Sequence, residues 1–559
     1  MKLTHKHSLQ AKACSLLAVT VALVTMAASN AAADHVRVFN EKVSGVPAAN
    51  PVAISPNALS PEFTAGLVEQ GADLLENSSG VITSFGNLDD GSRTEPDENT
   101  YLILDHNPGG PTPGYDYGRH FLFQGHENSG NLAHVTRINL DVASPDHRIT
   151  LLTPVDESGL TEFNSIDGST WDPFSGTLLF TQEAGTIGGV IEMGADFDPN
   201  TGGGAGLRTL YGSLGRGGYE GIHPDDWGNI LIIEDVGGAT VLNKGRNPNS
   251  FVYRFVPLSP DDLTHGKLQA LQLSINGNPV VFVPVDDQHP NGDTRSENQL
   301  LLHTVGASWP VQWVTLHDTE IDGTDEFDAN ALAKALGATP FKRPENGQFQ
   351  PGSHFQTFFF DMTGDTDNTA GTDPVLAARG AWGGIFRVDL DANRETGNIS
   401  LVVLGDADHA SFDNLTFVDD RDTILVAEDR GDTLHDQLNK LDSIWAYKLN
   451  KQHPERNIVT RFVALGLDQV AGVPGEEDNE PTGLHMSEGD STISGLIGTK
   501  VFKTDRARLF FTQQHGENNL LEIFPPRLSQ TERPAQAGSA PDGIPSGAFF
   551  CAKRTGISD

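Results

Sequence analysis

The chain has 559 residues, and its 75 acidic side chains outnumber its 37 Lys and Arg, giving a formal net charge of -38 at pH 7. This balance argues against a nucleic-acid-binding protein, because phosphate backbones require basic partners. It favours bound divalent cations or adaptation to salty surroundings, and composition leaves both open. The 60 Gly and 32 Pro are scattered along the chain, which favours one large body of strands and turns over linked domains.

Residues 1–33 have the features of a secretory signal: a basic start, an apolar run over residues 16–28, and Ala31, Ala32 and Ala33 as a small-residue cleavage site. The apolar run is too short to span a membrane, so we expect a periplasmic or secreted protein with no membrane span. Removing the signal takes Cys14 away and leaves Cys551 alone. The mature chain is therefore expected to hold no internal disulfide and no thiolate-rich metal site.

Residues 34–100 are predicted to form an N-terminal arm. Within it, residues 60–76 are predicted to hold a short helix with Phe63, Leu67 and Leu74 as its apolar positions. The strand series is expected to start at Tyr101. Residues 530–559 are rich in Pro, Gly, Ala and Ser and are predicted to form a loose C-terminal tail.

One unit recurs in variant forms. In residues 224–235 a turn leads into a buried apolar strand, residues 230–233, which ends in the acids Glu234 and Asp235. Single acids in this position commonly cap a turn, but the pattern returns along the chain. The corresponding runs end at Glu127, at Glu183, at Glu428 with Asp429, and at Gln514 with His515.

The recurrence predicts an all-β fold, a β-propeller over residues 101–529. The interval from Gly176 to Gly228 matches one four-stranded blade. If the recurring strands are the innermost ones, their terminal acids converge on the central channel. Such a set of oxygens suits calcium, which takes six to eight oxygen ligands.

Residues 258–340 interrupt the series as a long insertion. Two helices are predicted there, one holding Trp309 and Trp313 and one over residues 328–336, ended by Gly337. The insertion is expected to be a cap rather than a blade. Residues 363–368, with Asp365 and Asp367 around a turn, are either a calcium loop or a solvated turn.

Seven short segments, in order, resemble the PhoX-type alkaline phosphatases, a family of secreted β-propellers. The segments are residues 125–127, 170–183, 215–220, 233–235 with 253–257, 341–345, 413–415, and 482–483 with 514–515. The resemblance implies a propeller whose channel holds iron and calcium around a phosphate. It assigns the iron-site glutamates to Glu220 and Glu345 and the arginine to Arg343.

The chain departs from the family pattern in two places. The family's ligand cysteine would fall where this chain has Gln182, Glu183 and Ala184, and the histidine expected before Glu220 is Tyr219. Both changes put the iron centre in doubt, so the transition metal is expected to be iron or a substitute. The twin-arginine export signal is also missing.

These observations predict a secreted metal-dependent phosphatase that acts on small phosphate esters, as a monomer. Arg343 would bind the phosphate through its bidentate fork, and Glu345 would be both catalytic and a metal ligand. The remaining metal ligands or supporting groups are predicted to be Glu220, Glu127, Glu183, Glu234, Asp235, Glu428 and Asp429. His126 and His515 are expected to be ordinary turn histidines. The alternative is a calcium-stabilised propeller without turnover that acts as a binding or surface protein.

Overall fold

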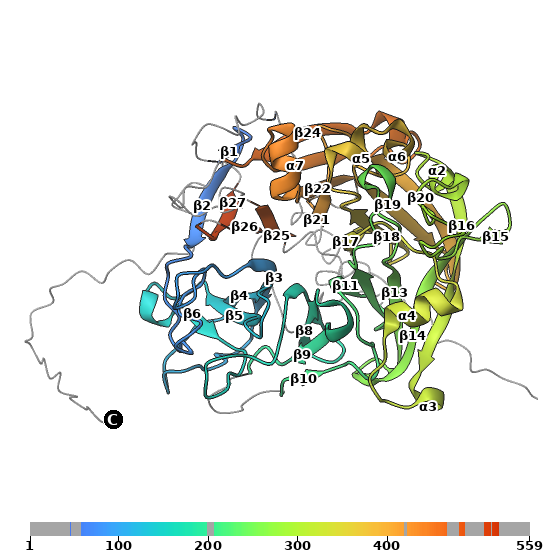
Figure 1. The fold of residues 1–559 in the computed structure, drawn as a ribbon. Coiled ribbons are helices and arrows are strands. Elements are labelled where there is room, and N and C mark those ends of the chain that lie inside the picture. The colour runs from blue at the N-terminus through green and yellow to red at the C-terminus, as the bar shows by residue number, and fades with distance from the viewer. Residues whose placement is uncertain are drawn as a thin grey trace, which may run out of the picture.

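The structure is a computed structural model that describes residue 45 and residues 57–197, 206–418, 422–466, 480–486, 508–515 and 517–524. Within them, antiparallel strands form six blades around one centre (Figure 1). The predicted signal and C-terminal tail lie outside the described residues. None of the helices in the described part is long and apolar enough to cross a membrane.

Four blades are separate sheets, and their strands follow the chain from the centre outward, apart from β1 and β2. Blade 1 holds β3 (Pro96–Ile103), β4 (His120–His126), β5 (His134–Asn139) and β6 (Ile149–Leu151). Blade 2 holds β7 (Ile166–Asp172), β8 (Thr177–Gln182), β9 (Gly189–Met193) and β10 (Arg208–Thr209). Blade 5 holds β21 (Phe412–Phe417), β22 (Thr423–Glu428), β23 (Ser443–Lys448), β24 (Ile458–Ala464) and β1 (Ala58–Leu59). Blade 6 holds β25 (Glu480–Met486), β26 (Leu509–Gln514), β27 (Asn519–Phe524) and β2 (Thr64–Glu69).

Blades 3 and 4 belong to one continuous sheet of ten strands. Blade 3 holds β11 (Tyr219–Pro224), β12 (Ile230–Glu234), β13 (Val252–Ser259) and β14 (Asp262–Ile275). Blade 4 holds β17 (Pro344–Phe349), β18 (Thr357–Met362), β19 (Gly384–Leu390) and β20 (Thr396–Leu404). β16 (Ser308–Asp318) pairs with both β14 and β20 and joins the outer edges, and β15 (Asn278–Pro279) extends β14.

The insertion therefore continues the propeller, since β14 completes blade 3 and β16 connects it to blade 4. The helix predicted around Trp309 and Trp313 is wrong, because both residues lie in β16. Positions four apart share one face of a helix and also one face of a strand, so this spacing could not separate the two. The second helix is confirmed as α4 (Ala329–Leu336), with Asp328 accepting from the amide of Ala331 and Gly337 left-handed at φ 80°.

The N-terminal arm also contributes strands. The helix predicted over residues 60–76 is wrong, because β2 occupies Thr64–Glu69 and pairs with β27 near the other end of the described chain. β2 closes the ring, since a blade completed by strands from both ends ties the first and last blades together. Because the partner strand lies so far along the sequence, no local pattern could reveal the pairing.

Among the described residues, six of the eight apolar clusters lie between neighbouring blades, one for each pair of blades. Both faces of a blade are therefore buried, and alternate residues of one strand enter different clusters. In β18, Phe358 and Phe360 pack toward blade 3 while Phe359 packs toward blade 5. This explains the continuous apolar runs in the sequence, because a strand buried on both faces has no polar side.

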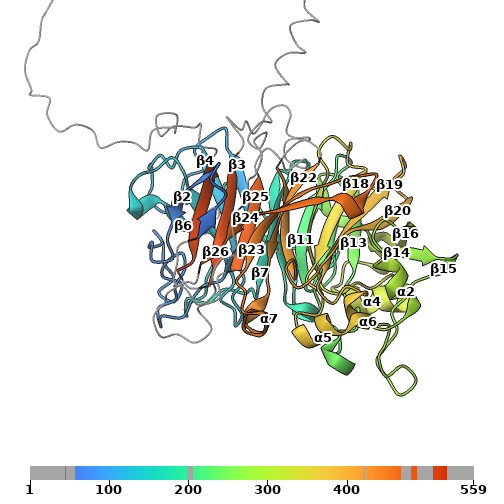
Figure 2. The same cartoon turned by 90° about the horizontal axis from the view of Figure 1, so that it is seen from above.

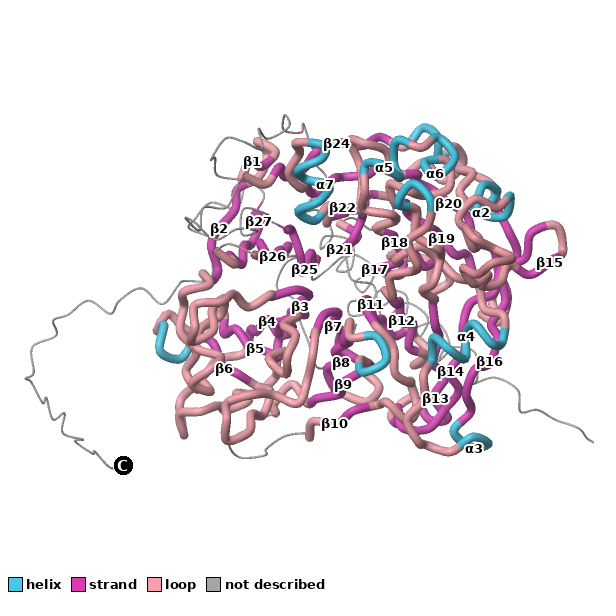
Figure 3. The backbone as a smooth tube through the Cα atoms, in the orientation of Figure 1, coloured by secondary structure: helices cyan, strands magenta, loops and turns pink. Residues whose placement is uncertain are grey.

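The helices are short and lie in connecting segments (Figure 3). α2 (Glu297–Leu302) and α3 (Thr319–Asp322) flank β16, and four single 3-10 turns cover Pro145–His147, Gly185–Ile187, Leu242–Lys244 and Pro454–Arg456. α5 (Asn368–Thr372) and α6 (Pro374–Ala377) follow β18, and α7 (Gly431–Leu438) follows β22. These last three helices lie on one face of the ring (Figure 2), the face at which the second strand of each blade ends.

Candidate metal centre in the propeller channel

The innermost strand of each blade carries the same irregularity near its start. Pairing with the second strand shifts register after the first or third residue of β3, β7, β11, β17, β21 and β25, as expected for a β-bulge. In five of the six strands, the first residue inside the bulge is an acid. These acids are Asp97, Asp167, Glu220, Glu345 and Asp413, and the sixth strand has Gly483 there.

The bulges allow the inner strands to approach one another closely around the centre. A Cβ on Gly168 of β7 would lie 2.2 Å from the carbonyl oxygen of Glu220 in β11. Gly483 of β25 has φ 57°, and a Cβ there would lie 2.5 Å from the carbonyl oxygen of Asp97 in β3. Only glycine fits such contacts without displacing a neighbouring backbone. The small residues following the acids therefore set how near the acids of adjacent blades can come.

A second layer of acids comes from the strands that the sequence singled out. Those strands are second from the centre, not innermost, but Glu127, Glu183, Asp235 and Asp429 directly follow β4, β8, β12 and β22. Each of these blades thus directs one acid from its bulge and one from the end of its second strand toward the channel.

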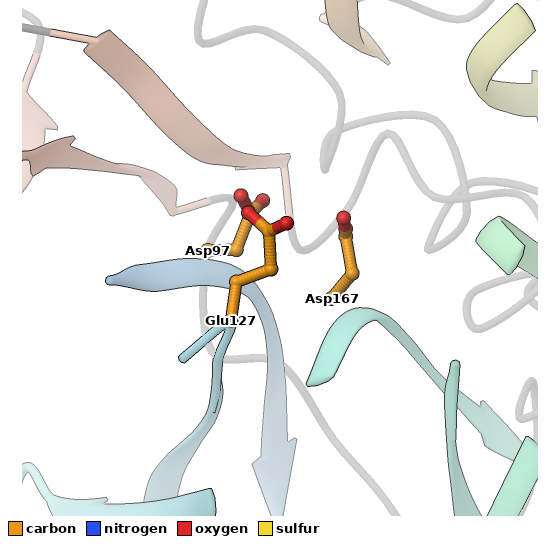
Figure 4. A group of neighbouring side chains, drawn as sticks. All are labelled: Asp97, Glu127 and Asp167. Carbon is orange, nitrogen blue, oxygen red and sulfur yellow. The ribbon is translucent and has the colours of Figure 1, made fainter. Parts of the chain in front are cut away.

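The two layers combine into three triads of carboxylates. The triads are Asp97 with Glu127 and Asp167, Asp167 with Glu183 and Glu220, and Glu220 with Asp235 and Glu345; within each, one oxygen per residue lies within 4.8 Å of the others. Asp167 and Glu220 are shared, so the triads form one arc across blades 1 to 4. Figure 4 shows the first triad, whose side chains extend from two blades into the same space.

The arc has strong negative charge that the protein only partly compensates. Burial, followed by repulsion from neighbouring acids, raises the pKa of Asp97, Glu127 and Glu220 well above the ordinary carboxyl range. Burial and the charge of Asp235 raise the pKa of Glu183 to about 7. Burial and the charge of Asp429 raise the pKa of Asp413 to about 8. Without a cation, the cluster would hold protons at neutral pH.

Several carboxylate oxygens in the arc have no hydrogen-bond donor among the described residues. They are Oδ1 of Asp97, Oδ1 of Asp167, Oδ1 of Asp235 and Oε1 of Glu345. All four residues are buried. Buried oxygens without donors are costly, and a divalent cation is the partner that would satisfy several of them at once.

Arg343 lies at the edge of this arc, directly before β17. Its Nε donates to Oδ2 of Asp235 at 2.7 Å, and its Nη2 lies 3.6 Å from Oε1 of Glu345. The arginine adopts a left-handed conformation at φ 49°, although it precedes Pro344. Proline restricts the residue before it, so this is a strained backbone held by its surroundings. The turn directs Lys342 away into a buried ion pair with Asp365 and places Arg343 at the channel.

Two of the predicted residues point elsewhere. Glu234 accepts hydrogen bonds from the Tyr253 hydroxyl at 2.8 Å and the Asn330 amide at 3.0 Å, and burial raises its pKa to about 8. Glu428 accepts from Nη2 of Arg430 at 2.6 Å. Each is the last residue of its strand, and the alternation of a strand sends it to the side opposite the acid that follows.

The two histidines and the acidic turn considered in the sequence analysis contact other parts of the protein. His126 is buried and stacked on His134, with ring centroids 4.0 Å apart. His515 pairs with Glu480 at 3.5 Å. In residues 363–368, Asp365 pairs with Lys342 and Asp367 caps α5. Each of those two acids is thus engaged by the protein rather than set in a triad.

Gln182 stands where the family pattern would put a cysteine. Its amide donates to the carbonyl of Asn164 at 3.0 Å, and its oxygen accepts from the Tyr211 hydroxyl at 2.6 Å. Both ends of the side chain are therefore occupied. Cys14 and Cys551 lie outside the described residues, so the donors gathered in the described channel are carboxylate oxygens.

Asp97, Asp167 and Asp413 were not predicted from the sequence. They lie in inner strands that are interrupted by polar residues and bulges, so no apolar run marks them. A usable signal was present in a repeated pair, usually an acid followed by a small or polar residue. This pair lies in the inner strand of each blade, ahead of the apolar run that forms the second strand. The pairs are Asp97-Glu98, Asp167-Gly168, Glu220-Gly221, Glu345-Asn346 and Asp413-Asn414, with Thr482-Gly483 as the sixth.

Comparison with known proteins agrees with this architecture. The family model of alkaline phosphatase PhoX matches residues 221–465, which span blades 3 to 5. The structure of Pseudomonas fluorescens PhoX in complex with vanadate, a transition-state analogue, is similar with a TM-score of 0.52. The two chains are 13% identical, and the match covers 86% of this chain and 97% of that one.

A WD40 domain of coronin from Toxoplasma gondii matches with a TM-score of 0.33 at 9% identity, covering 87% of this chain and 90% of that one. A comparison with curated protein sequences gave no match. The chain is thus similar to alkaline phosphatase PhoX over residues 221–465 and shares the propeller fold of the solved PhoX structure.

Proposed function

We propose that the protein is a metal-dependent phosphoesterase of the alkaline phosphatase type that hydrolyses small phosphate esters in the propeller channel. The observation that carries this proposal is the arc of buried carboxylates with unpartnered oxygens, next to one guanidinium. Phosphoryl transfer requires positive charge around the phosphate and a positioned oxygen nucleophile. The similarity of residues 221–465 to alkaline phosphatase PhoX supports the same reaction class.

The donor set fits calcium. Carboxylate oxygens are hard ligands, and neighbouring triads that share Asp167 and Glu220 could hold more than one ion. Bound divalent cations would neutralise charge on the phosphate and lower the pKa of a water molecule. We infer that the ligands are Asp97, Glu127, Asp167, Glu183, Glu220, Asp235 and Glu345, with Asp413 and Asp429 on the neighbouring blade.

A thiolate-ligated iron centre does not fit the described channel, because the position expected for the cysteine is Gln182 and its amide is hydrogen-bonded on both sides. Oxygen ligands prefer magnesium, calcium or manganese. We therefore propose calcium, rather than iron, as the metal that the site binds.

The chain's own contribution to the reaction centres on Arg343. Its Nε is held by Asp235, which orients the guanidinium, and its Nη2 lies 3.6 Å from Oε1 of Glu345 in the arc. A guanidinium in this position can donate two hydrogen bonds to the non-bridging oxygens of a phosphate. Its fixed orientation would align the ester without reorganisation during the reaction.

We further propose that the protein is exported through the signal in residues 1–33 and acts in the periplasm or outside the cell, where calcium is plentiful. The ring is closed by strands of one chain, β2 and β27, and all the triads come from that chain. A monomer would therefore hold a complete site.

The proposal is tested by hydrolysis of p-nitrophenyl phosphate and of its bis-ester at alkaline pH, with calcium and after chelation. We expect turnover of the monoester that chelation removes and calcium restores. Glu345→Gln should lower kcat/KM at least about 100-fold, because it removes one negative ligand beside Arg343. Glu320→Gln, an exposed acid on α3, is the matched control and should retain activity.

If the calcium-loaded wild type shows no turnover while calcium still raises the melting temperature, the proposed phosphatase activity is overturned. The alternative, a calcium-stabilised propeller that acts as a binding protein, would then remain. Equal loss of activity in Glu345→Gln and Glu320→Gln would show that the reaction takes place elsewhere.

A further inference from the structure

A pocket of about 400 Å³ opens beside Arg343 on the face that carries α5, α6 and α7. It is built by the loops that follow the second strands of blades 3, 4 and 5. The loop of blade 3 contributes Thr240, Lys244 and Arg246, and the loop of blade 4 contributes Asp365, Thr366 and Asp367. The loop of blade 5 contributes Asp429, Arg430, Gly431 and Thr433. Arg343 lines the pocket and also contacts the carboxylate arc, so the two spaces meet at one side chain.

Two cations of the pocket, Lys244 and Arg246, attract Asp367 and Asp365 electrostatically, but their side chains are not held by direct contacts within the described residues. Neither the ammonium of Lys244 nor the guanidinium of Arg246 makes an ion pair or hydrogen bond with another described residue, whereas Arg430 is bound to Glu428. The three acids of the pocket have other partners: Asp365 is held by Lys342, Asp367 accepts from the backbone amide of Thr369, and Asp429 accepts from the backbone amide of Gly431. Positive charge therefore remains available in the pocket of a strongly acidic chain.

The loop that carries the two cations is held in place from several sides. The backbone amide of Arg246 donates to Oδ1 of Asp365 at 2.9 Å, and the side-chain amide of Asn243 donates to Oδ2 of Asp373 at 2.8 Å. The amide of Val241 donates to the carbonyl of Gly245 at 2.8 Å, closing the turn. Lys244 and Arg246 are thus presented by a preorganised loop, which lowers the entropic cost of binding an anion.

We propose that this pocket binds a second phosphate group of the substrate, on the leaving-group side of the phosphate that is hydrolysed. This rests on the proposed phosphatase function. With the scissile phosphate at Arg343, a leaving group that enters the pocket would meet Lys244, Arg246 and the hydroxyls of Thr240, Thr366 and Thr433. Phosphate suits this set, because it accepts several hydrogen bonds and carries up to two negative charges. The preferred substrates would be bisphosphorylated small molecules.

The reaction is ordinary hydrolysis. Water oxygen forms the new bond to phosphorus, the bond from phosphorus to the ester oxygen breaks, and the leaving alkoxide takes up a proton. The products are inorganic phosphate and an alcohol that keeps its second phosphate, and no redox partner is needed. The pocket changes which ester is favoured, not the chemistry.

The test compares glycerol 1,3-bisphosphate with glycerol 3-phosphate, two esters of the same alcohol. In the calcium-loaded full chain, we expect a higher kcat/KM for the bisphosphate. In the double variant Lys244→Gln with Arg246→Gln, the ratio of the two kcat/KM values should fall about 10- to 100-fold, mainly through KM, because charge-assisted hydrogen bonds are lost. The double variant Lys448→Gln with Lys451→Gln, an equal charge change at the end of β23 and in the loop after it, should leave the ratio unchanged.

Calorimetry separates this proposal from the phosphatase proposal. Propane-1,3-diphosphonate, which cannot be hydrolysed, should bind the calcium-loaded protein more tightly than propylphosphonate, and the double variant should lose that difference. If no ester is hydrolysed while this binding pattern holds, the pocket stands and the phosphatase function fails. If esters are hydrolysed and the double variant changes neither the ratio nor the binding, the pocket proposal is overturned.

Discussion

At the scale of single residues, Arg343 links the sequence most directly to the chemistry. It is the neighbour of a buried lysine, and the left-handed turn at φ 49° sends the two cations to different acids. Such strain costs of order 1–3 kcal/mol and persists only where surrounding contacts enforce it. Here the ion pair of Lys342 with Asp365 and the hydrogen bond of Arg343 to Asp235 hold the turn from both sides.

Arg343→Lys should lower kcat/KM for a phosphate monoester about 100-fold, because lysine keeps the charge but lacks the fork that donates two parallel hydrogen bonds. The calcium-induced rise in melting temperature should persist, since the carboxylates remain. Steady-state kinetics and thermal melts with and without calcium check both parts.

Arg387→Lys is the control, because Arg387 also has 21% of its side chain exposed and also pairs with an aspartate. Similar losses in the two variants would contradict a specific role for Arg343.

At the scale of elements, the inner-strand bulges decide the geometry of the site. Each bulge adds residues to the inner strand without adding them to its partner, and the added residues are the acids. The glycines next to them allow adjacent blades to approach. The second strands then place Glu127, Glu183, Asp235 and Asp429 at the same level. Neither set alone makes a triad.

Gly168→Ala should destabilise the protein by about 1–3 kcal/mol, because the new Cβ would clash with the Glu220 carbonyl and push blades 2 and 3 apart. The same displacement should weaken calcium binding about tenfold, since Asp167 and Glu220 belong to one triad. Urea unfolding and calcium titrations measure the two effects.

Gly206→Ala serves as the control, because a Cβ there meets no atom of the described residues within 4 Å. Unchanged calcium affinity in Gly168→Ala would show that the bulge contact does not set the spacing of the acids.

At the scale of the whole molecule, the ring gathers charge that no single blade could hold. The pKa of Asp97 is raised by burial and then by Asp167 and Asp413, which belong to two other blades. Such repulsion opposes ring closure whenever the acids are ionised. A cation at the centre would reverse this effect and tie the blades together.

Stability without metal should therefore fall as pH rises. Glu183 and Asp413 have folded-state pKa values of about 7 and 8, above their ordinary values of 4.5 and 3.8. Between these limits the folded protein binds more protons than the unfolded one, so the free energy of unfolding decreases with increasing pH. In chelator, the melting temperature should drop by several degrees from pH 5 to pH 8.

Calcium should raise the melting temperature more at pH 8 than at pH 5, and its binding near neutral pH should release protons. Thermal melts across this range, and calorimetry in buffers of different ionisation enthalpy, measure these effects. A calcium-induced shift that is equal at both pH values, with no proton release, would contradict the assignment of the buried acids as ligands.

The sequence alone determined the strand-forming units, the propeller and the resemblance to PhoX. Apolar runs such as residues 230–233 and 358–360 are strong local signals, because blades buried on both faces require continuous apolar strands. Short motifs in order then identified the relatives and singled out Arg343, Glu345 and Glu220. The two ends of α4 could also be predicted from the sequence, since the caps Asp328 and Gly337 act within one turn of the helix.

The tertiary structure decided which of these residues meet. Asp97, Asp167 and Asp413 are far apart in sequence and lie in strands with no apolar pattern, so only the ring places them at one centre. The direction of the Glu234 and Glu428 side chains depends on the alternation of residues along a strand within a blade. Closure of the ring by β2 depends on a partner strand at the opposite end of the described chain. Local propensity acts over a few residues, whereas convergence at a propeller axis is a property of the closed ring.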